Sequence, residues 1–266
     1  MSDEIFLMKG NEAISHTAIR YGADGYFGYP ITPQSEILET LMTEAPWETT
    51  GMVVLQAESE TASINMVYGG AACGKAVMTS SSSTGMSLMQ EGISFIAAAE
   101  LPCLLINVMR GGPGLGTIQP SQADYFQTVK GGGHGDYKLI TLAPASVQEM
   151  SDHVVLGFDL AFKYRTPAFI LTDGAIGQMM EKVKLPEFQR RRTDAEIRKQ
   201  CPWATLGKTP DRAPNIITTL ELDSQKMEDM NIRLQEKYKQ IEEELVLFEE
   251  TKCEDADYIL VAFGLT

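Results

Sequence analysis

The sequence is poor in the residues that bind metals in clusters. It has four cysteines, and no two of them form a Cys-x-x-Cys pair. Iron–sulfur clusters and structural zinc sites rely on cysteines at such short spacings. The three histidines are also isolated along the chain. We therefore predict no metal ligands in this chain and expect any metal cluster to lie on another chain.

Long apolar runs and an excess of positive charge are missing as well. No stretch approaches the roughly 18 apolar residues that span a membrane, and the start MSDEIFLMKG lacks the basic and apolar parts of a signal peptide. Lys and Arg number 22 against 36 Asp and Glu, a formal net charge of -14. Binding to a nucleic-acid backbone depends largely on Lys and Arg. We therefore expect a cytoplasmic protein with no membrane segment and no nucleic-acid partner.

What is present is a regular alternation of strand and helix patterns in 266 residues that are 44% hydrophobic. Short, nearly continuous apolar runs are typical of buried parallel strands, and they occur at residues 25–28, 52–55, 76–78, 103–109, 139–142 and 168–172. Helical patterns lie between them, at residues 11–20, 34–43, 61–73, 86–98 and 147–162. This alternation predicts an α/β fold with a doubly wound, mostly parallel sheet.

Beyond Thr172 the alternation weakens. Residues 182–215 mix prolines with the basic cluster 190–192, which predicts an extended arm that wraps a neighbour or the domain itself. From Met227, apolar residues recur at steps of three and four and predict one long amphipathic helix, which packs on its own chain or in a coiled coil. A last strand is predicted over residues 258–263. We thus expect a domain over 1–181, the arm and helix over 182–252, and the start of a truncated C-terminal domain over 253–266.

Two glycine-rich segments resemble nucleotide-binding motifs without meeting their requirements. Residues 69–75 match the start of a P-loop, but Ala76 stands where magnesium needs Ser or Thr, and the predicted order is helix then strand rather than strand then helix. In residues 112–116 the last glycine comes one position too early for a dinucleotide-binding turn. We therefore predict neither function.

Two carboxylates, Glu58 and Glu60, follow a predicted strand and open a predicted helix. Ligands of open α/β sheets bind at the carboxyl ends of the strands, so an acid at this junction is well placed for chemistry. The alternative is stabilisation of the helix N-terminus, which is worth about 0.3–1 kcal/mol for each acid in the first turn.

Further polar motifs are predicted at the same sheet edge. Residues 80–85 present hydroxyls after a strand, and helix capping is the simpler explanation for them. Arg110 ends another strand, where a guanidinium can bind a carboxylate with two hydrogen bonds. Two prolines stiffen the segment 29–33 and direct Thr32 toward the same crevice. Each of these signals is weak by itself.

Together, four motifs resemble the alpha-type subunits of 2-oxoacid:ferredoxin oxidoreductases in identity and order. They are Tyr-Pro-Ile-Thr-Pro at 29–33, Gln-Ala-Glu-Ser-Glu at 56–60, the hydroxyl-rich residues 79–85 and Arg-Gly-Gly-Pro at 110–113. The interval from Glu60 to Gly69 also resembles the pattern of pyrimidine-binding thiamine diphosphate domains. The resemblance covers nearly the whole chain and implies this fold.

The resemblance also implies roles for individual residues. Glu60, rather than Glu58, would be the catalytic carboxylate that hydrogen-bonds the aminopyrimidine ring of thiamine diphosphate. Tyr29 and Pro30 would contact the cofactor, and Thr32 and Arg110 would hold the 2-oxo acid. Residues 82–85 depart from the Gly-Pro-Gly of many relatives, so no cofactor contact is transferred to them.

The implied reaction is oxidative decarboxylation of a 2-oxo acid to an acyl-coenzyme A, with coenzyme A as co-substrate and ferredoxin as electron acceptor. No Gly-Asp-Gly followed by Asn is present, so the resemblance places the diphosphate and magnesium on a diphosphate-binding partner subunit. Iron–sulfur clusters would lie on ferredoxin-type partner subunits.

Within the family, residues 114–116 and 120–125 resemble the branched-chain (2-oxoisovalerate) members. The alternatives are a 2-oxoglutarate or pyruvate type, a lipoamide-linked 2-oxoacid dehydrogenase component, and a non-catalytic assembly subunit.

Overall fold

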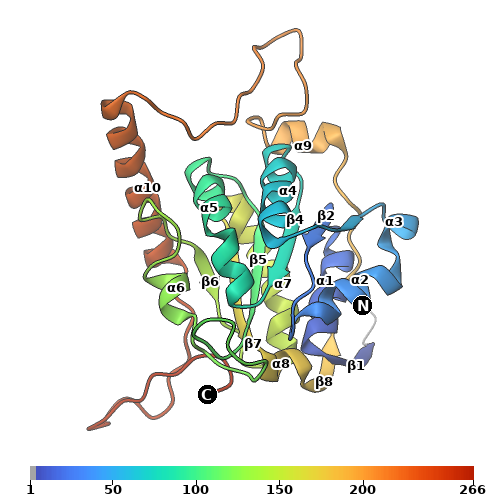
Figure 1. The fold of residues 1–266 in the computed structure, drawn as a ribbon, viewed down its shortest axis with the longest axis vertical. Coiled ribbons are helices and arrows are strands. Elements are labelled where there is room, and N and C mark those ends of the chain that lie inside the picture. The colour runs from blue at the N-terminus through green and yellow to red at the C-terminus, as the bar shows by residue number, and fades with distance from the viewer. Residues whose placement is uncertain (1–3) are drawn as a thin grey trace.

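The computed structural model describes residues 4–266 and contains a central sheet of six parallel strands in the order β3-β2-β4-β5-β7-β6 (Figure 1). The strands are β2 (Gly25–Gly28), β3 (Val53–Gln56), β4 (Val77–Ser81), β5 (Leu104–Met109), β6 (Ile140–Leu142) and β7 (Ala168–Asp173). Each lies close to a predicted strand. The predicted α/β fold with a doubly wound parallel sheet is therefore confirmed.

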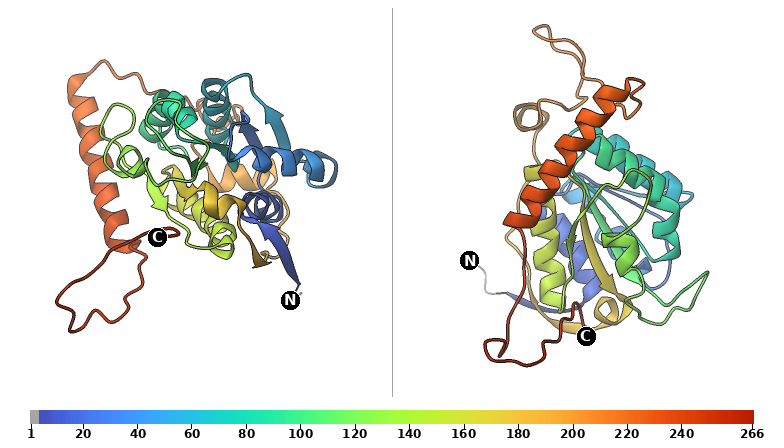
Figure 2. Two further views of the ribbon diagram at one scale, coloured as in Figure 1. Left: turned by 60° about the horizontal axis from the view of Figure 1, so that its bottom comes forward. Right: turned by 90° about the vertical axis from the view of Figure 1, so that its left-hand side faces the viewer.

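Helices cover both faces of this sheet (Figure 2). Successive side chains of a strand point to opposite faces, so Leu105 and Phe169 enter one apolar core while Ile106 and Ile170 enter the other. The first core contains residues of α4 (Glu60–Ala72) and α5 (Thr84–Ala98). The second contains residues of α1 (Gly10–Tyr21), α2 (Ser35–Glu44) and α7 (Val147–Tyr164). The sheet is thereby held between two helical layers.

Several short elements are absent from the prediction. They are β1 (Ile5–Lys9), α3 (Pro46–Thr49), α6 (Tyr125–Val129), α8 (Gly174–Gln178), β8 (Met180–Lys184) and α9 (Asp194–Gln200). β1 and β8 form a separate antiparallel pair that depends on contacts between distant segments, which a local pattern does not reveal. The predicted arm therefore begins inside a strand and contains a helix. The proposed domain boundary after residue 181 lies within β8, and the division into domains stays a prediction.

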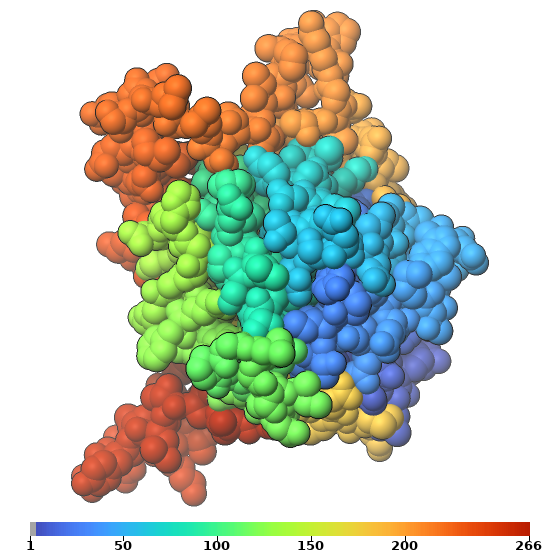
Figure 3. Space-filling model, viewed as in Figure 1, coloured from blue at the N-terminus to red at the C-terminus, as the bar shows by residue number. Residues whose placement is uncertain are grey.

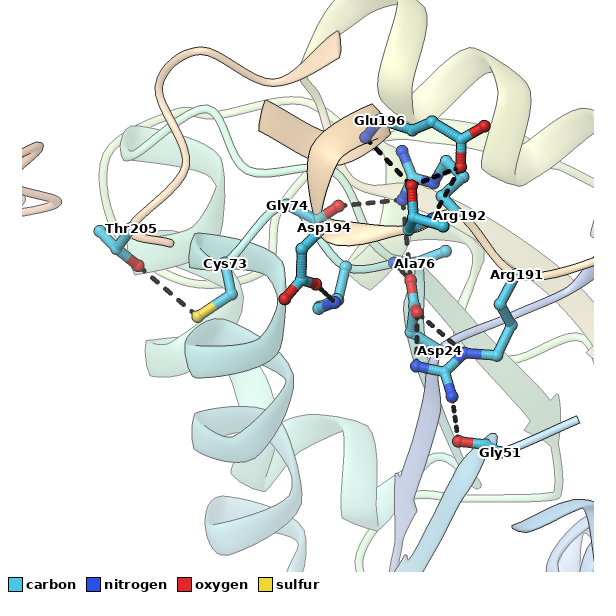
Figure 4. Close-up of polar contacts among 12 residues, drawn as sticks. Asp24, Gly51, Cys73, Gly74, Ala76, Arg191, Arg192, Asp194, Glu196 and Thr205 are labelled. Carbon is cyan, nitrogen blue, oxygen red and sulfur yellow. Dashed lines mark hydrogen bonds and ion pairs between the residues drawn. The ribbon is translucent and has the colours of Figure 1, made fainter. Parts of the chain in front are cut away.

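The basic cluster of the arm binds its own domain at the amino ends of the sheet strands (Figure 4). Arg191 donates to Asp24 Oδ1 from Nε at 3.0 Å and from Nη2 at 2.8 Å. The other carboxylate oxygen accepts the Ala76 backbone N–H at 2.8 Å. Arg192 donates to the Gly74 carbonyl at 2.9 Å. Since Asp24 and Ala76 directly precede β2 and β4, one buried carboxylate joins two strand starts and the arm.

The long helix α10 (Ser224–Glu244) also packs on its own chain, and a coiled-coil role is not needed to bury its apolar stripe. Leu234, Tyr238 and Ile241 enter the core beside α7. Lys237 forms an ion pair with Glu100 at 3.0 Å, and Arg233 binds the same carboxylate. Burial raises the pKa of Glu100, but the hydrogen bonds and charges of Arg233 and Lys237 outweigh this effect and lower that pKa overall.

The strand predicted at residues 258–263 is wrong, because this segment is irregular in the structure. Leu260 and Val261 are exposed, and only Phe263 makes a ring contact, with Tyr125 at 5.3 Å between centroids. A strand needs a pairing partner for its backbone groups, and no strand of residues 4–266 supplies one here. None of the helices in that same range is long and apolar enough to cross a membrane.

The attachment of the arm generates a first prediction. Arg191→Ala leaves the buried Asp24 carboxylate without its main cationic partner, so we expect the free energy of unfolding to fall by about 2 kcal/mol, less than for a fully buried pair because Arg191 is partly exposed. Urea unfolding of both proteins measures the difference. Arg190→Ala is the matched control, because Arg190 pairs with Glu196 on the exposed surface and its loss should leave the midpoint unchanged. Equal effects of the two substitutions would contradict this account of the arm.

Candidate functional site

The four sequence motifs meet at the carboxyl edge of the sheet, opposite the arm. β2, β4 and β5 are neighbours and parallel, so the segments that follow them leave the sheet on the same side. The β4–β5 register pairs Ser81 with Asn107. This register brings residues 82–85 next to Arg110. In the space-filling view, the loop after β5 (green) lies beside α5 (teal) and the blue segment that follows β2 (Figure 3).

Glu60 is the first residue of α4 and is 6% exposed, whereas Glu58 lies on the surface. The helix is capped by Ser59, whose Oγ accepts the Ala62 N–H at 3.2 Å. No group in residues 4–266 donates a hydrogen bond to the Glu60 carboxylate, so the carboxylate keeps its hydrogen-bonding capacity although the residue as a whole is buried. Helix-dipole stabilisation does not require such burial. The Glu60 carboxylate is therefore available to a ligand, and its role stays a prediction.

The N-terminus of α5 approaches Glu60 closely. A Cβ atom at Gly85 would lie 2.7 Å from Glu60 Oε1 and 2.0 Å from Ser81 Oγ, so only glycine fits there. The hydroxyls of Ser81 and Ser82 are buried and have no hydrogen-bond partner within the described chain. The walls beside the carboxylate thus retain unused hydrogen-bonding capacity.

Arg110 is a buried cation at the end of β5. Its Nη1 donates to the Thr32 carbonyl at 3.0 Å, and its Nη2 donates to Thr84 Oγ1 at 3.2 Å and to the Leu115 carbonyl at 3.0 Å. Its Nε has no partner, and no carboxylate of residues 4–266 forms an ion pair with it. A guanidinium held only by neutral acceptors is available to an anionic ligand.

Behind Arg110, three polar side chains form a closed ring. Ser83 Oγ donates to Asp124 Oδ2 at 2.6 Å, and Asn107 Nδ2 donates to the same oxygen at 2.9 Å. The backbone N–H of Ser83 donates to Asn107 Oδ1 at 2.9 Å. Ser83 sits at the N-cap of α5 but makes no capping bond, so the capping explanation for residues 80–85 is wrong. Its hydroxyl donates instead to Asp124 in the loop after β5.

The remaining predicted residues lie at the same edge with less direct contacts. Thr32 touches Arg110 through its carbonyl, and its side chain is exposed. The Tyr29 carbonyl accepts a hydrogen bond from Gln34 Nε2 at 3.0 Å, and Pro30 is exposed. No hydrogen bond of the described chain joins Tyr29 or Pro30 to Glu60 or Arg110. The structure thus brings Thr32 and Arg110 together and leaves Tyr29 and Pro30 beside them.

The sequence interpretation placed Ser83 at this edge, among the hydroxyls of residues 80–85, but missed Asn107 and Asp124 as parts of the site. Asn107 carried a usable signal, because it is a polar residue within an otherwise apolar buried strand. Asp124 carried no such signal, since its contacts with Ser83 and Asn107 depend on the path of the loop after β5. Within residues 4–266, no three His, Cys, Asp or Glu side chains gather closely enough to hold a metal ion. The site instead combines a buried hydrogen-bonding carboxyl group with a fixed cation.

Comparisons with known proteins identify the family of this chain. Residues 16–249 match the family described as pyruvate flavodoxin/ferredoxin oxidoreductase, thiamine diphosphate-binding. The chain is 51% identical to ketoisovalerate oxidoreductase subunit VorB of Methanothermobacter marburgensis, over 98% of this chain and 72% of that protein. It is 43% identical to 2-oxoglutarate synthase subunit KorA of Methanocaldococcus jannaschii, over 68% of this chain and 49% of that protein.

The structure is similar to that of 2-oxoglutarate:ferredoxin oxidoreductase from Magnetococcus marinus, solved with 2-oxoglutarate, coenzyme A and succinyl-CoA bound. The TM-score is 0.78 at 29% identity, with 91% of this chain covered. This chain spans only 46% of the length of that chain.

The fold and the family match therefore define a thiamine diphosphate-binding α/β domain, and its buried Glu60 lies at the carboxyl edge of a parallel sheet. The chain belongs to the pyruvate flavodoxin/ferredoxin oxidoreductase family. The family and the oxidoreductase class predicted from the four motifs are confirmed, and the 51% relative agrees with the branched-chain assignment within the family.

The contact between α5 and Glu60 generates a second prediction. Gly85→Ala places a methyl group against Ser81 and Glu60, and the overlap should outweigh the better helix propensity of alanine. We expect the free energy of unfolding to fall by about 1–3 kcal/mol in urea titrations. Gly69→Ala is the control, because nothing lies within 4 Å of its added Cβ and it should be neutral or slightly stabilising. A stabilising Gly85→Ala would show that the approach of α5 to Glu60 is looser than described.

Proposed function

We propose that this chain supplies the pyrimidine-binding half of a thiamine diphosphate site in a 2-oxoacid:ferredoxin oxidoreductase that acts on a branched-chain 2-oxo acid. The reaction is oxidative decarboxylation to an acyl-coenzyme A with reduction of ferredoxin. The observation that carries the proposal is the buried Glu60 carboxylate, which lacks a partner in residues 4–266 and lies at the edge where Arg110 offers an uncompensated cation.

The residues at this edge fit the pyrimidine half of the cofactor. Thiamine diphosphate supplies the carbon nucleophile for attack on a 2-oxo group. Glu60 would hydrogen-bond a ring nitrogen of the pyrimidine and exchange a proton with it, and this contact would give the Glu60 carboxyl group the partner that it lacks in residues 4–266. Tyr29 and Pro30 contact the cofactor from the segment after β2. The diphosphate and magnesium belong to a partner subunit, and iron–sulfur clusters belong to ferredoxin-type partner subunits.

Arg110 and Thr32 hold the 2-oxo acid in this proposal. The Arg110 guanidinium is fixed by three neutral oxygen acceptors, so it offers its charge to the substrate carboxylate without breaking an ion pair. The substrate side chain then faces the loop of residues 111–124. This loop carries Leu115 and Ile118 but no Lys or Arg. An apolar, branched side chain is therefore favoured over one that ends in a second carboxylate.

The third prediction concerns Glu60. In the complex assembled with its partner subunits, Glu60→Gln or Glu60→Ala should reduce turnover by roughly 10²–10⁴-fold, the usual contribution of a positioned acid–base group. Coenzyme A-dependent viologen reduction measures the rate, and size-exclusion chromatography checks assembly. Glu58→Gln is the matched control, because Glu58 is exposed two residues away and its loss should not change the rate. Full activity of Glu60→Ala would favour the alternative of a non-catalytic assembly subunit.

The fourth prediction concerns the substrate. Across a panel of 2-oxo acids, kcat/KM for 2-oxoisovalerate should exceed that for 2-oxoglutarate by about 100-fold or more, because a second carboxylate would meet no cation in residues 111–124. A preference for 2-oxoglutarate or pyruvate would support the proposed reaction but contradict the proposed branched-chain substrate. Binding of thiamine diphosphate without viologen reduction by any acid would instead favour a lipoamide-linked dehydrogenase component.

A further inference from the structure

The ring of Ser83, Asn107 and Asp124 holds together two segments that both contribute to the site. Ser83 belongs to the turn between β4 and α5, Asn107 to β5, and Asp124 to the end of the loop after β5. Asn107 is fully buried and Ser83 is 8% exposed. All three hydrogen bonds are 2.9 Å or shorter. The ring therefore fixes the far end of the loop against the sheet edge.

Two features set Asp124 apart from an ordinary loop carboxylate. It occupies the N-cap of α6, where aspartate normally accepts a helix N–H, but its side chain makes no capping bond. One of its oxygens instead receives both Ser83 and Asn107. Ser83 is held at a positive φ of 37°, which a serine rarely adopts without support. The carboxylate thus stabilises a strained turn rather than its own helix.

The ring connects directly to Arg110. The Ser83 hydroxyl accepts the Arg110 backbone N–H at 3.1 Å, and Thr84, the next residue, accepts from the Arg110 guanidinium. The same guanidinium donates to the Leu115 carbonyl within the loop that Asp124 anchors. Main chain and side chain of Arg110 are therefore both fixed by segments that the ring joins.

We propose that Asp124 is a positioning residue for substrate binding: through Ser83 and Asn107 it holds the loop 111–124 and orients Arg110 toward the substrate carboxylate. This inference rests on the proposed function, since it assigns Arg110 to the 2-oxo acid. It separates two tasks within one site. Glu60 acts on the cofactor from α4, whereas Asp124 acts on substrate affinity from the loop.

The test uses the assembled complex with the variants Asp124→Ala, Asp124→Asn, Ser83→Ala and the double variant Asp124→Ala with Ser83→Ala. Asp124→Ala should raise KM for 2-oxoisovalerate about tenfold, the effect of losing one charge-assisted contact, with kcat and the thiamine diphosphate requirement unchanged. Asp124→Asn keeps an oxygen for both donors and should restore most of the affinity. The double variant should be no worse than either single one, because both break the same ring.

Gln127→Ala is the matched control. Gln127 lies three residues further on and also bonds α5, through Ser87 at 3.0 Å, but it is outside the ring and its loss should leave KM unchanged. Loss of kcat at unchanged KM, or a lower melting temperature with unaltered kinetics in Asp124→Ala, would overturn the proposal. The Asn and Ser83 variants keep the test open if Asp124→Ala does not assemble.

Hydrogen–deuterium exchange in the same complexes gives a readout that does not need activity. The hydrogen-bonded backbone amides of Gly111 and Thr117 in this loop should exchange on the order of tenfold faster in Asp124→Ala and in Ser83→Ala than in the wild type or Gln127→Ala. If the wild-type complex turns over no 2-oxo acid, the proposed function fails while exchange still tests the ring. Unchanged exchange in this loop would overturn the positioning role in either case.

Discussion

The parallel register of β4 against β5 is the constraint on which the site depends. It pairs Ser81 with Asn107, so the turn after β4 and the loop after β5 leave the sheet side by side. That placement lets Ser83 reach Asn107, Asp124 and the Arg110 backbone, and lets Gly85 approach Glu60. A slip of one residue would turn every side chain of the strand to the opposite face and separate these groups. The pairing of β4 with β5 therefore places Glu60 and Arg110 on either side of the turn that follows β4.

The two edges of the sheet use charge in opposite ways. At the amino edge, the buried Asp24 carboxylate accepts hydrogen bonds from Arg191 and from Ala76, and it is satisfied within its own chain. At the carboxyl edge, Glu60 accepts none, and Arg110 has no carboxylate partner in residues 4–266. A buried carboxylate and an arginine thus stabilise the fold at the amino edge, whereas a buried carboxylate and an arginine remain available for ligand binding at the carboxyl edge.

Much of the fold could be predicted from the sequence because the central strands are apolar and short, and because helical periods lie between most of them. The residues Glu60 and Arg110 could also be selected, since both follow strands at the edge where ligands bind. β1 and β8 could not be predicted, because their pairing joins residues near 5 with residues near 184. Asp124 could not be selected as a site residue either. The loop after β5 folds back to the turn after β4, and the residues next to Asp124 in the sequence do not reveal this path. The strand predicted at residues 258–263 is wrong for a related reason. This segment has β-propensity but no pairing partner, so the chain is irregular there.

Buried polar atoms without hydrogen-bond partners are concentrated at the carboxyl edge of the sheet. They lower the stability of the fold and leave hydrogen-bonding groups available to a ligand. Four buried polar atoms without partners lie in β4, in the turn after it or at the end of β5: the hydroxyls of Thr79, Ser81 and Ser82, and Nε of Arg110. Each unmade hydrogen bond of a buried group costs about 1–3 kcal/mol. A sheet edge built for stability alone would have apolar residues at these positions, as β5 has at every position except Asn107. A ligand that supplies the missing partners recovers this free energy on binding, so the edge has a built-in preference for a polar ligand that the opposite edge lacks.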